Sequence, residues 1–452
     1  MNMKKLITLL IVLICCAGTV GATDYIVTGN SAITKNNHQG YWVDNDNKLV
    51  ETSTGSGIYT LVVDGCSLTA NTNYGFQIKV NEDAWDTNTI FPATQYNITV
   101  PYTGTYTIIY YVDIANKAIR VLAKPFLRCN LFNNWTHVYD TTASHVFTLE
   151  SDGLTFTREI SAEDFTGDTS FRIFSPVFKK SAYPDGQDIV LTYGGNAVAS
   201  AYFNTAESTD WSWKIAKPSY DFKKVVIKAV YDPFANSDFG TWNVSADAYI
   251  TVSVSNAGYA TFSYACPLDL SEVTEFDTYV ASGIDDVNGS KYVHMTKITS
   301  AVPESTGLLL VKEGGCTNVE VPVAASADAP TNLLVATVTE QQVAASTSSS
   351  HHYFLANGAN GIGFYNLASA ATSGANKAYL NTGATELTTV NGNHLSRVAW
   401  IFDDSGTTDI HTIDRSPLSI DNAAPIYNIA GQRVANDYKG IVIQNGKKFI
   451  NK

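Results

Sequence analysis

The feature that most constrains this chain is a two-residue alternation of apolar and polar side chains. In residues 74–80, Tyr, Phe, Ile and Val alternate with Gly, Gln and Lys. Successive side chains of a β-strand point to opposite faces, so this period is typical of a strand with one buried face. Similar runs follow at short intervals, separated by turn residues such as Pro101 and Gly104. No stretch of comparable length has the period of an amphipathic helix, so we predict an all-β protein.

A weak internal repeat indicates that the first half of the chain holds two copies of one unit. Phe76-Gln77-Ile78 has a counterpart in Phe171-Arg172-Ile173, and Phe91-Pro92 has one in Tyr183-Pro184. The correspondence holds until an insertion at about residues 187–218. We therefore predict tandem Ig-like β-sandwich modules at residues 23–124 and 125–246, the second of which carries the insertion.

The amino-acid composition of the sequence changes after Tyr249. Aromatic residues thin out, Ala, Ser, Thr and Gly become common, and short strand candidates continue. We expect a third β-rich module of unknown function at residues 247–414. Residues 415–452 are expected to be a linker and a tail, in which two short apolar runs flank Asn445-Gly446. That arrangement predicts a short β-hairpin, because Asn-Gly favours a two-residue hairpin turn.

The first 22 residues have the pattern of a signal peptide. Lys4 and Lys5 precede an apolar run at 6–14, and small residues end at Ala22. The run is shorter than the roughly 20 residues that span a bilayer. Lipidation at Cys15 or Cys16 is disfavoured, because neither follows Gly, Ala or Ser. We expect an exported mature chain that starts at Thr23 and has no transmembrane segment.

Charge and cysteine spacing exclude several classes of partner. The net charge is −13 without basic clusters, which argues against nucleic acids and anionic membranes. Cys66, Cys129, Cys266 and Cys316 are far apart and form no Cys-x-x-Cys pair, so a zinc site is not expected. Export permits disulfides. A bond between Cys266 and Cys316 and a pair of free thiols remain equally open.

Recognisable catalytic motifs are absent from the sequence. It has neither a His-x-x-x-His pair nor a Gly-x-Ser-x-Gly elbow. His351 and His352 adjoin a Ser-rich stretch and are expected to be solvated rather than to bind a ligand. We expect a protein that is not an enzyme and has no cofactor and no metal site.

Two tryptophans in polar stretches carry the functional hypothesis. Trp42 and Trp85 are flanked by Asp and Asn or Glu side chains. An indole can stack on the apolar face of a sugar ring while amides and carboxylates bind its hydroxyl groups. Tryptophan in a β-sandwich is more often a core residue. The alternative is therefore a structural or adhesive surface protein whose sandwiches act as spacers.

Short motifs around these residues resemble known starch-binding modules. Residues 74–80, followed by Ala84-Trp85-Asp86 and Phe91-Pro92, resemble the Ig-like modules of pullulanases and of SusE/SusF-type outer-membrane starch-binding proteins. The resemblance implies that Trp42 and Trp85 flank an α-glucan such as starch. It also places Gln77 where those families usually have a lysine.

A second motif extends the resemblance to the second module. Phe132-Asn133-Asn134-Trp135 is similar to the Phe-Asn-x-Trp element of glycogen-binding sandwiches. The resemblance implies that Trp135 contacts glycan. Phe178 or Lys179 lies near the expected second tryptophan, for which Trp211 or Trp213 in the insertion would stand in.

The rest of the chain resembles secreted proteins of Bacteroidetes-type bacteria. Residues 257–262 and 361–365 match modules for which the resemblance implies no function. Residues 427–434 with 439–443 resemble a type IX secretion sorting tail, which implies a secretion-machinery receptor as a partner and a secreted or outer-membrane-associated surface location. Together these patterns predict an exported, non-catalytic carbohydrate-binding protein.

Overall fold

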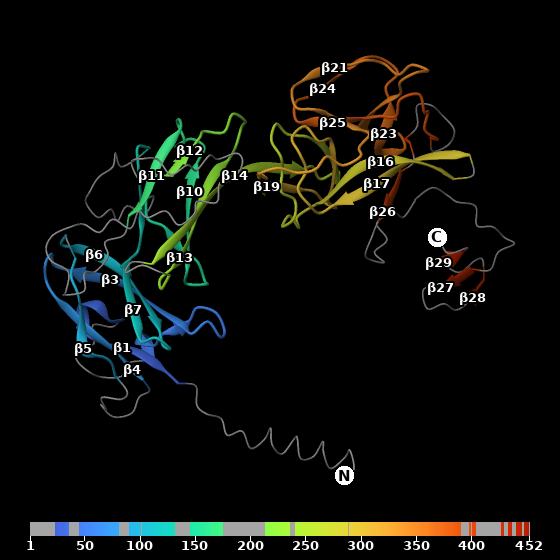
Figure 1. Ribbon diagram of the computed structural model, residues 1–452. Coiled ribbons are helices and arrows are strands. Elements are labelled where there is room, and N and C mark those ends of the chain that lie inside the picture. Colours follow the sequence, from blue (N-terminus) through green and yellow to red (C-terminus); the bar gives the residue numbers. More distant parts are fainter. Residues whose placement is uncertain are drawn as a thin grey trace, which may run out of the picture. The chain divides into compact units, whose positions relative to one another are not determined.

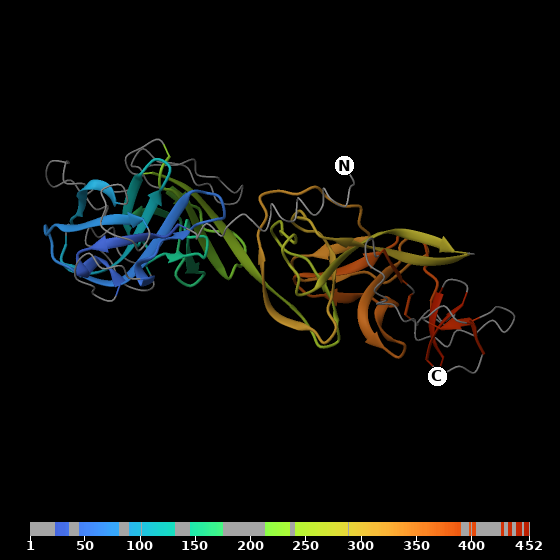
Figure 2. The ribbon, with the colours of Figure 1, turned by 90° about the horizontal axis from the view of Figure 1, so that it is seen from below.

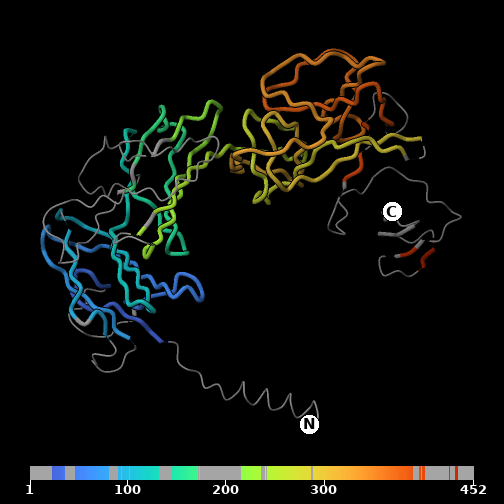
Figure 3. Tube along the Cα trace, viewed as in Figure 1, coloured from blue at the N-terminus to red at the C-terminus, as the bar shows by residue number. Residues whose placement is uncertain are grey.

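A computed structural model gives the arrangement of most of the chain between residues 23 and 451. It describes residues 23–35, 45–80, 90–100, 102–131, 145–174, 213–235, 240–287, 289–389, 397–398, 400–403, 426–428, 433–435, 440–444 and 447–451; the others are grey in Figure 3. Within these ranges there is no α-helix, and the only helical turns are the 3-10 turns η1 (Ser31–Ile33) and η3 (Asn45–Asn47). The prediction of an all-β fold built from sandwich modules is confirmed.

The first sandwich consists of a three-stranded and a four-stranded sheet. Their orders are β1-β4-β5 and β2-β3-β6-β7, and all their pairs are antiparallel (Figure 1). Phe76 and Ile78 meet Ile108 and Tyr110 in one core, and burial of each such side chain contributes roughly 1.5–3 kcal/mol. The strands are β1 (Tyr25–Gly29), β2 (Val50–Glu51), β3 (Ile58–Leu68), β4 (Tyr74–Val80), β5 (Ile90–Ile98), β6 (Gly104–Asp113) and β7 (Ala118–Ala123).

The second sandwich repeats this topology and adds one strand, β19, at the edge of its larger sheet. Its sheets have the orders β8-β11-β12 and β9-β10-β13-β14-β19. Phe171 and Ile173 of the sequence repeat lie on the central strand β11, as Phe76 and Ile78 lie on β4. The strands are β8 (Phe126–Cys129), β9 (Thr148–Leu149), β10 (Thr155–Ser161), β11 (Thr169–Phe174), β12 (Trp213–Ile215), β13 (Lys224–Asp232), β14 (Thr241–Val254) and β19 (Cys316–Pro322).

The two sandwiches contact each other through buried aromatic side chains. The Tyr111 hydroxyl donates a hydrogen bond of 2.9 Å to the Gly153 carbonyl. The Tyr111 ring meets the Tyr231 ring edge-on at 5.4 Å between centroids, and Tyr231 packs against Trp242 at 4.6 Å. All three side chains are almost completely buried. The contact is thus packed like a protein core rather than like a flexible linker.

The chain forms two compact units, and the first unit is discontinuous in sequence. Unit 1 comprises residues 1–251 with residues 320–326, and unit 2 comprises residues 252–319 with residues 327–452. The border expected after residue 124 falls between β7 and β8, inside unit 1. The border expected after residue 246 falls within β14.

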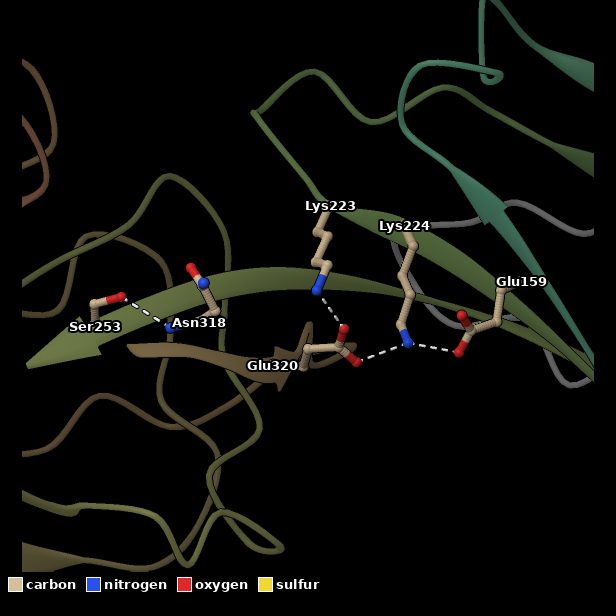
Figure 4. Close-up of polar contacts among 6 residues, drawn as sticks. All are labelled: Glu159, Lys223, Lys224, Ser253, Asn318 and Glu320. Atoms are coloured by element: carbon tan, nitrogen blue, oxygen red, sulfur yellow. Dashed lines mark hydrogen bonds and ion pairs between the residues drawn. The ribbon is translucent and has the colours of Figure 1, made fainter. Parts of the chain in front are cut away.

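A cluster of four charged side chains holds the returning segment in unit 1 (Figure 4). Glu320 accepts hydrogen bonds from Lys223 and Lys224, both at 2.7 Å. Lys224 also lies 2.5 Å from Glu159, and its ammonium is 5.4 Å from the centre of the Tyr249 ring. These contacts join Glu320 of β19 to β13 and β10 within the second sandwich.

Unit 2 is built around a five-stranded and a four-stranded sheet. The orders are β15-β18-β16-β17-β26 and β20-β25-β22-β23, and β21 pairs with β24 separately. Their shared core includes Met295, Leu309, Phe364 and Leu380. The β16–β17 hairpin is long, as Figure 2 shows. The strands are β15 (Tyr259–Phe262), β16 (Asp277–Val287), β17 (Ser290–Ile298), β18 (Leu308–Val311), β20 (Leu334–Thr337), β21 (Gln341–Val343), β22 (His352–Gly358), β23 (Gly361–Asn366), β24 (Ala371–Ser373), β25 (Lys377–Asn381) and β26 (Trp400–Asp403).

The tail contains the predicted hairpin. Strands β29 (Gly440–Gln444) and β30 (Lys447–Asn451) pair so that Gln444 faces Lys447. Asn445 and Gly446, the expected turn, lie outside the described residues. Two further strands, β27 (Ile426–Asn428) and β28 (Arg433–Val434), complete a small sheet of order β28-β27-β29-β30.

The four cysteines of the expected mature chain are all free. Cys66, Cys129 and Cys266 are buried, and Cys316 is half-buried at the start of β19. The disulfide alternative for Cys266 and Cys316 is therefore wrong. Burial raises the pKa of the Cys66 and Cys266 thiols to about 12, because the apolar surroundings disfavour the thiolate.

Candidate glycan-binding site

Three of the four candidate site residues lie outside the described part of the chain. Trp42, Trp85 and Trp135 belong to residues 36–44, 81–89 and 132–144, and their roles stay predictions. Gln77 is described, on the central strand β4. We call residues 36–44 the first loop and residues 81–89 the second loop.

The base of the first loop is closed by one asparagine side chain. Asn47 lies in the turn η3, directly after this loop. Its Oδ1 accepts a hydrogen bond of 2.7 Å from the Lys35 backbone N–H, and its Nδ2 donates one of 3.4 Å to the Lys35 carbonyl. Asn47 is almost fully buried. Lys35 and Asn47, on either side of residues 36–44, are therefore held next to each other.

The base of the second loop lies in the same row of the sheet. Lys48, which follows Asn47, bridges to Ile26 on β1. Ile26 pairs with Lys79 on β4, and Lys79 pairs with Ile90 on β5. The second loop leaves one residue after Lys79 and returns at Ile90. The residues that flank the Trp42 and Trp85 loops therefore lie at the same end of the β1-β4-β5 sheet.

Gln77 has a structural role on β4 that the sequence did not predict. The β4–β5 register shifts on either side of it, because Phe76 pairs with Tyr96 whereas Ile78 pairs with Phe91. Gln77 Nε2 donates a hydrogen bond of 2.9 Å to the Pro92 carbonyl inside this bulge. A bulge leaves backbone groups without ladder partners, and the Gln77 amide satisfies one of them. Any contact of Gln77 with glycan stays a prediction.

Two other residues share the face of Gln77, away from the sandwich core. Thr28 pairs with Gln77 directly, and Lys79 lies two residues further along β4. Their side chains are only 4% and 3% exposed. Among the described residues, the buried Thr28 Oγ1 has no hydrogen-bond partner. Such an atom costs free energy unless water, a ligand or a group outside the described residues satisfies it.

The second sandwich places its candidate segments at equivalent points of the chain. Residues 132–144, with Trp135, follow β8 as the first loop follows β1. Residues 175–212 connect β11 to β12 as the second loop connects β4 to β5, and they include Trp211. Trp213 is the first residue of β12, opposite Phe171. The segment that contains Trp211 thus occupies the same place in the order of strands as the segment that contains Trp85.

One tryptophan of the first two modules is clearly a core residue. Trp242 on β14 is 1% exposed and packs against Phe156 at 5.3 Å as well as against Tyr231. It cannot act as a platform for sugar.

Other chemistry in the described ranges is sparse. No group of three or more His, Cys, Asp or Glu side chains there is arranged to hold a metal ion. Nor does that part of the chain include a helix with the length and hydropathy of a membrane span. A His294–Asp285 pair at 2.6 Å lies on the β16–β17 hairpin, where both side chains are partly exposed.

Two comparisons with known proteins found no match to this sequence. No protein-family model matches the sequence, and no curated protein is significantly similar to it. The candidate site therefore depends on its residues and geometry alone.

Proposed function

We propose that this protein is an exported carbohydrate-binding protein that takes an α-glucan such as starch between the Trp42 and Trp85 loops. The observation that carries the proposal is the common origin of the two loops in the row Lys48–Ile26–Lys79–Ile90. Two aromatic platforms need a fixed spacing to grip successive sugar rings. A shared, hydrogen-bonded base supplies that fixed origin.

Polar groups on the adjoining face support the same ligand class. Sugars present many hydroxyl groups, and a binding site needs a few fixed donors and acceptors next to its aromatic surface. Thr28 Oγ1 is buried without a hydrogen-bond partner among the described residues, on the same face of the sheet as Gln77. The acidic chain has no basic patch that would favour a polyanion instead.

The test is titration of the mature protein with soluble starch and maltooligosaccharides. Trp42→Ala and Trp85→Ala should each weaken binding by roughly 1–3 kcal/mol, the usual cost of losing an interface hot spot. The matched control is Trp242→Phe, which alters a core indole and should change stability but not affinity. Wild-type binding by both loop variants, or unfolding of both, would remove these residues from the site.

A second function is favoured by the contact between the sandwiches. The buried Tyr111–Gly153 hydrogen bond and the Tyr111–Tyr231 ring contact make unit 1 a stiff pair of domains, as a spacer or adhesin requires. Iodide quenching separates the two proposals. If Trp42→Phe and Trp85→Phe leave the quenchable fluorescence unchanged, the indoles are buried and the spacer function is favoured.

We further propose that the tail directs the protein to the cell surface through a secretion-machinery receptor. The support is its hairpin form and its resemblance to a sorting tail, since an isolated hairpin is marginal in water and gains from docking. Removal of residues 425–452 should leave thermal stability nearly unchanged but retain the protein in the periplasm. Normal surface delivery of the truncated protein, or its failure to fold, would contradict the sorting role.

Export itself has a direct check. N-terminal sequencing of the exported protein should begin at Thr23. An acylated Cys15 or Cys16 would instead make the chain a lipoprotein.

A further inference from the structure

A serine and a histidine at the start of β22 form a hydrogen-bonded pair. Ser350 Oγ lies 3.0 Å from His352 Nε2. The two residues are separated by one position, so their side chains emerge on one side of an extended segment. Both are partly buried. The pair belongs to unit 2, whereas the residues of the proposed glycan site belong to unit 1.

The surroundings of His352 fix which of its nitrogens carries the proton. His352 Nδ1 lies 2.8 Å from the Ala344 carbonyl oxygen. A carbonyl oxygen only accepts hydrogen bonds, so Nδ1 must be the protonated donor in the neutral ring. Nε2 then has a free lone pair. Ser350 is therefore the donor of the Ser350–His352 hydrogen bond.

The Ser350 proton has one competing acceptor, which is less favourable. Asn381 Oδ1 lies 3.4 Å from Ser350 Oγ, farther than His352 Nε2. That same Oδ1 already accepts a hydrogen bond of 2.9 Å from the Gly383 N–H. This bond also fixes the orientation of the Asn381 amide. The imidazole is thus the preferred acceptor for the serine proton.

The pair is held in place by backbone and ring contacts. The His352 N–H donates a hydrogen bond of 2.9 Å to Ser346 Oγ. The His352 ring meets the Tyr379 ring edge-on, with centroids 5.5 Å apart. The neighbouring His351 N–H donates to the Gly383 carbonyl at 2.8 Å. The geometry of a nucleophile, a base and an orienting acceptor is therefore preorganised.

We propose that Ser350 is a nucleophilic serine, activated by His352, that accepts an acyl group from an activated ester. Ser350 Oγ attacks the ester carbonyl while its proton moves to His352 Nε2. The bond from Oγ to the carbonyl carbon forms, and the bond from that carbon to the leaving alkoxide breaks. The proton on Nε2 then passes to the departing alkoxide, which leaves as an alcohol.

The main chain around the pair indicates one acyl transfer rather than rapid turnover. The N–H groups of Ser350, His351 and His352 are all engaged in hydrogen bonds, to Thr347, Gly383 and Ser346 respectively. They are therefore not available as an oxyanion hole, whose loss costs about 10²–10³ in rate. Ser350 is thus a site of acylation rather than the nucleophile of a rapid hydrolase.

The experiment treats the full-length mature protein with p-nitrophenyl acetate and maps acetyl groups by peptide mass spectrometry. We expect about one acetyl group on the Ser350 hydroxyl, with release of one equivalent of p-nitrophenolate. His352→Phe keeps a ring against Tyr379 but removes the base, so it should slow acetylation of Ser350 about 100-fold. Ser350→Ala should remove that acetyl group.

Matched controls lie next to both residues. Ser349→Ala and His351→Phe change the same residue types one position away and should leave the Ser350 rate unchanged. Equal acetylation of Ser349 and Ser350, or a wild-type rate in folded His352→Phe, would overturn the proposal. Nitrogen NMR of the wild-type protein gives a test without any variant: a His352 ring protonated on Nε2 in its neutral form would also overturn it.

Discussion

The ammonium of Lys224 lies 2.7 Å from the carboxylate of Glu320, although the two residues are far apart in the sequence. Lys224 is on β13 and Glu320 is on β19, and both belong to unit 1. The Lys224 side chain is 14% exposed and that of Glu320 is 33% exposed. A pair that is this well shielded is screened less by solvent than a surface pair.

Loss of the Glu320 charge should weaken unit 1. Glu320→Gln removes the partner of Lys223 and leaves Lys224 with Glu159 alone. We expect a loss of roughly 1–2 kcal/mol in the free energy of unfolding, toward the low end for hydrogen bonds to charged groups because Glu320 is one-third exposed. Urea denaturation measures it. The control is Lys297→Met at the exposed Lys297–Asp277 pair, where a change below about 0.5 kcal/mol is expected.

The contribution of Glu320 should depend on pH in a defined direction. Burial alone would raise the pKa of its carboxyl, but hydrogen bonds from Lys223 and Lys224 outweigh burial and lower that pKa below 4.5. A carboxyl whose pKa is lowered on folding stabilises the fold above its unfolded pKa and loses that effect as pH falls through the folded value. The stability gap between wild type and Glu320→Gln should therefore be constant above about pH 5 and shrink on acidification below pH 4.5. A gap that widens in acid would contradict this assignment.

The hydroxyl of Tyr111 should stabilise the contact between the two sandwiches. Tyr111→Phe leaves the Gly153 carbonyl without its 2.9 Å donor in a buried place, which should cost roughly 1–2 kcal/mol of unfolding free energy. Tyr365→Phe is the comparison, because the Tyr365 hydroxyl donates to the Gly361 carbonyl at an exposed position. Thermal unfolding of both variants should show a clear loss only for Tyr111→Phe.

A substitution of Thr28 distinguishes an effect on glycan affinity from an effect on stability. Thr28→Val replaces Oγ1, which has no hydrogen-bond partner among the described residues, with a methyl group of similar size, so the free energy of unfolding should stay unchanged or rise slightly. If the hydroxyl serves a glycan, affinity for maltooligosaccharides should fall in the same variant. Unaltered affinity with unaltered stability would exclude Thr28 from the site.

The thiols should differ in reactivity according to burial. With a pKa of about 12, the Cys66 and Cys266 thiols are ionised to only about one part in 10⁴ at pH 8. Cys129 is buried as well, whereas Cys316 is half-buried. A colorimetric thiol assay should count one fast thiol in the folded mature protein and four after unfolding. A count of two after unfolding would restore the Cys266–Cys316 disulfide.

Local sequence patterns predicted those strands and turns whose conformation depends on residues close by in the sequence. Alternation identified β4 with Phe76 and Ile78 on its buried face, and Asn445-Gly446 located the tail hairpin. Both features are set by side-chain period and turn preference within a few residues. The same alternation carried a signal that we did not use, since it places Lys79 on the face of Gln77.

Features that depend on distant strands escaped prediction. The Gln77 amide bonds to Pro92 because the β4–β5 register shifts, and no local pattern encodes that shift. The addition of β19 to the second sandwich brings Glu320 next to Lys224, although many residues, including strands of unit 2, separate the two in the sequence. Pairings between distant segments leave no periodic trace in either segment. The Ser350–His352 pair was missed for a related reason, because its orientation depends on the Ala344 carbonyl.

The discontinuity of unit 1 limits how this gene can exchange parts with others. Residues 252–319 interrupt unit 1, which regains residues 320–326 as the end of β19 and the segment after it. A recombination point within the interruption would deliver a second sandwich without Glu320 and with an unpaired β14 edge, a surface prone to aggregation. The smallest transferable segment that keeps the second sandwich whole must therefore extend to residue 326 and carry residues 252–319 of unit 2 with it.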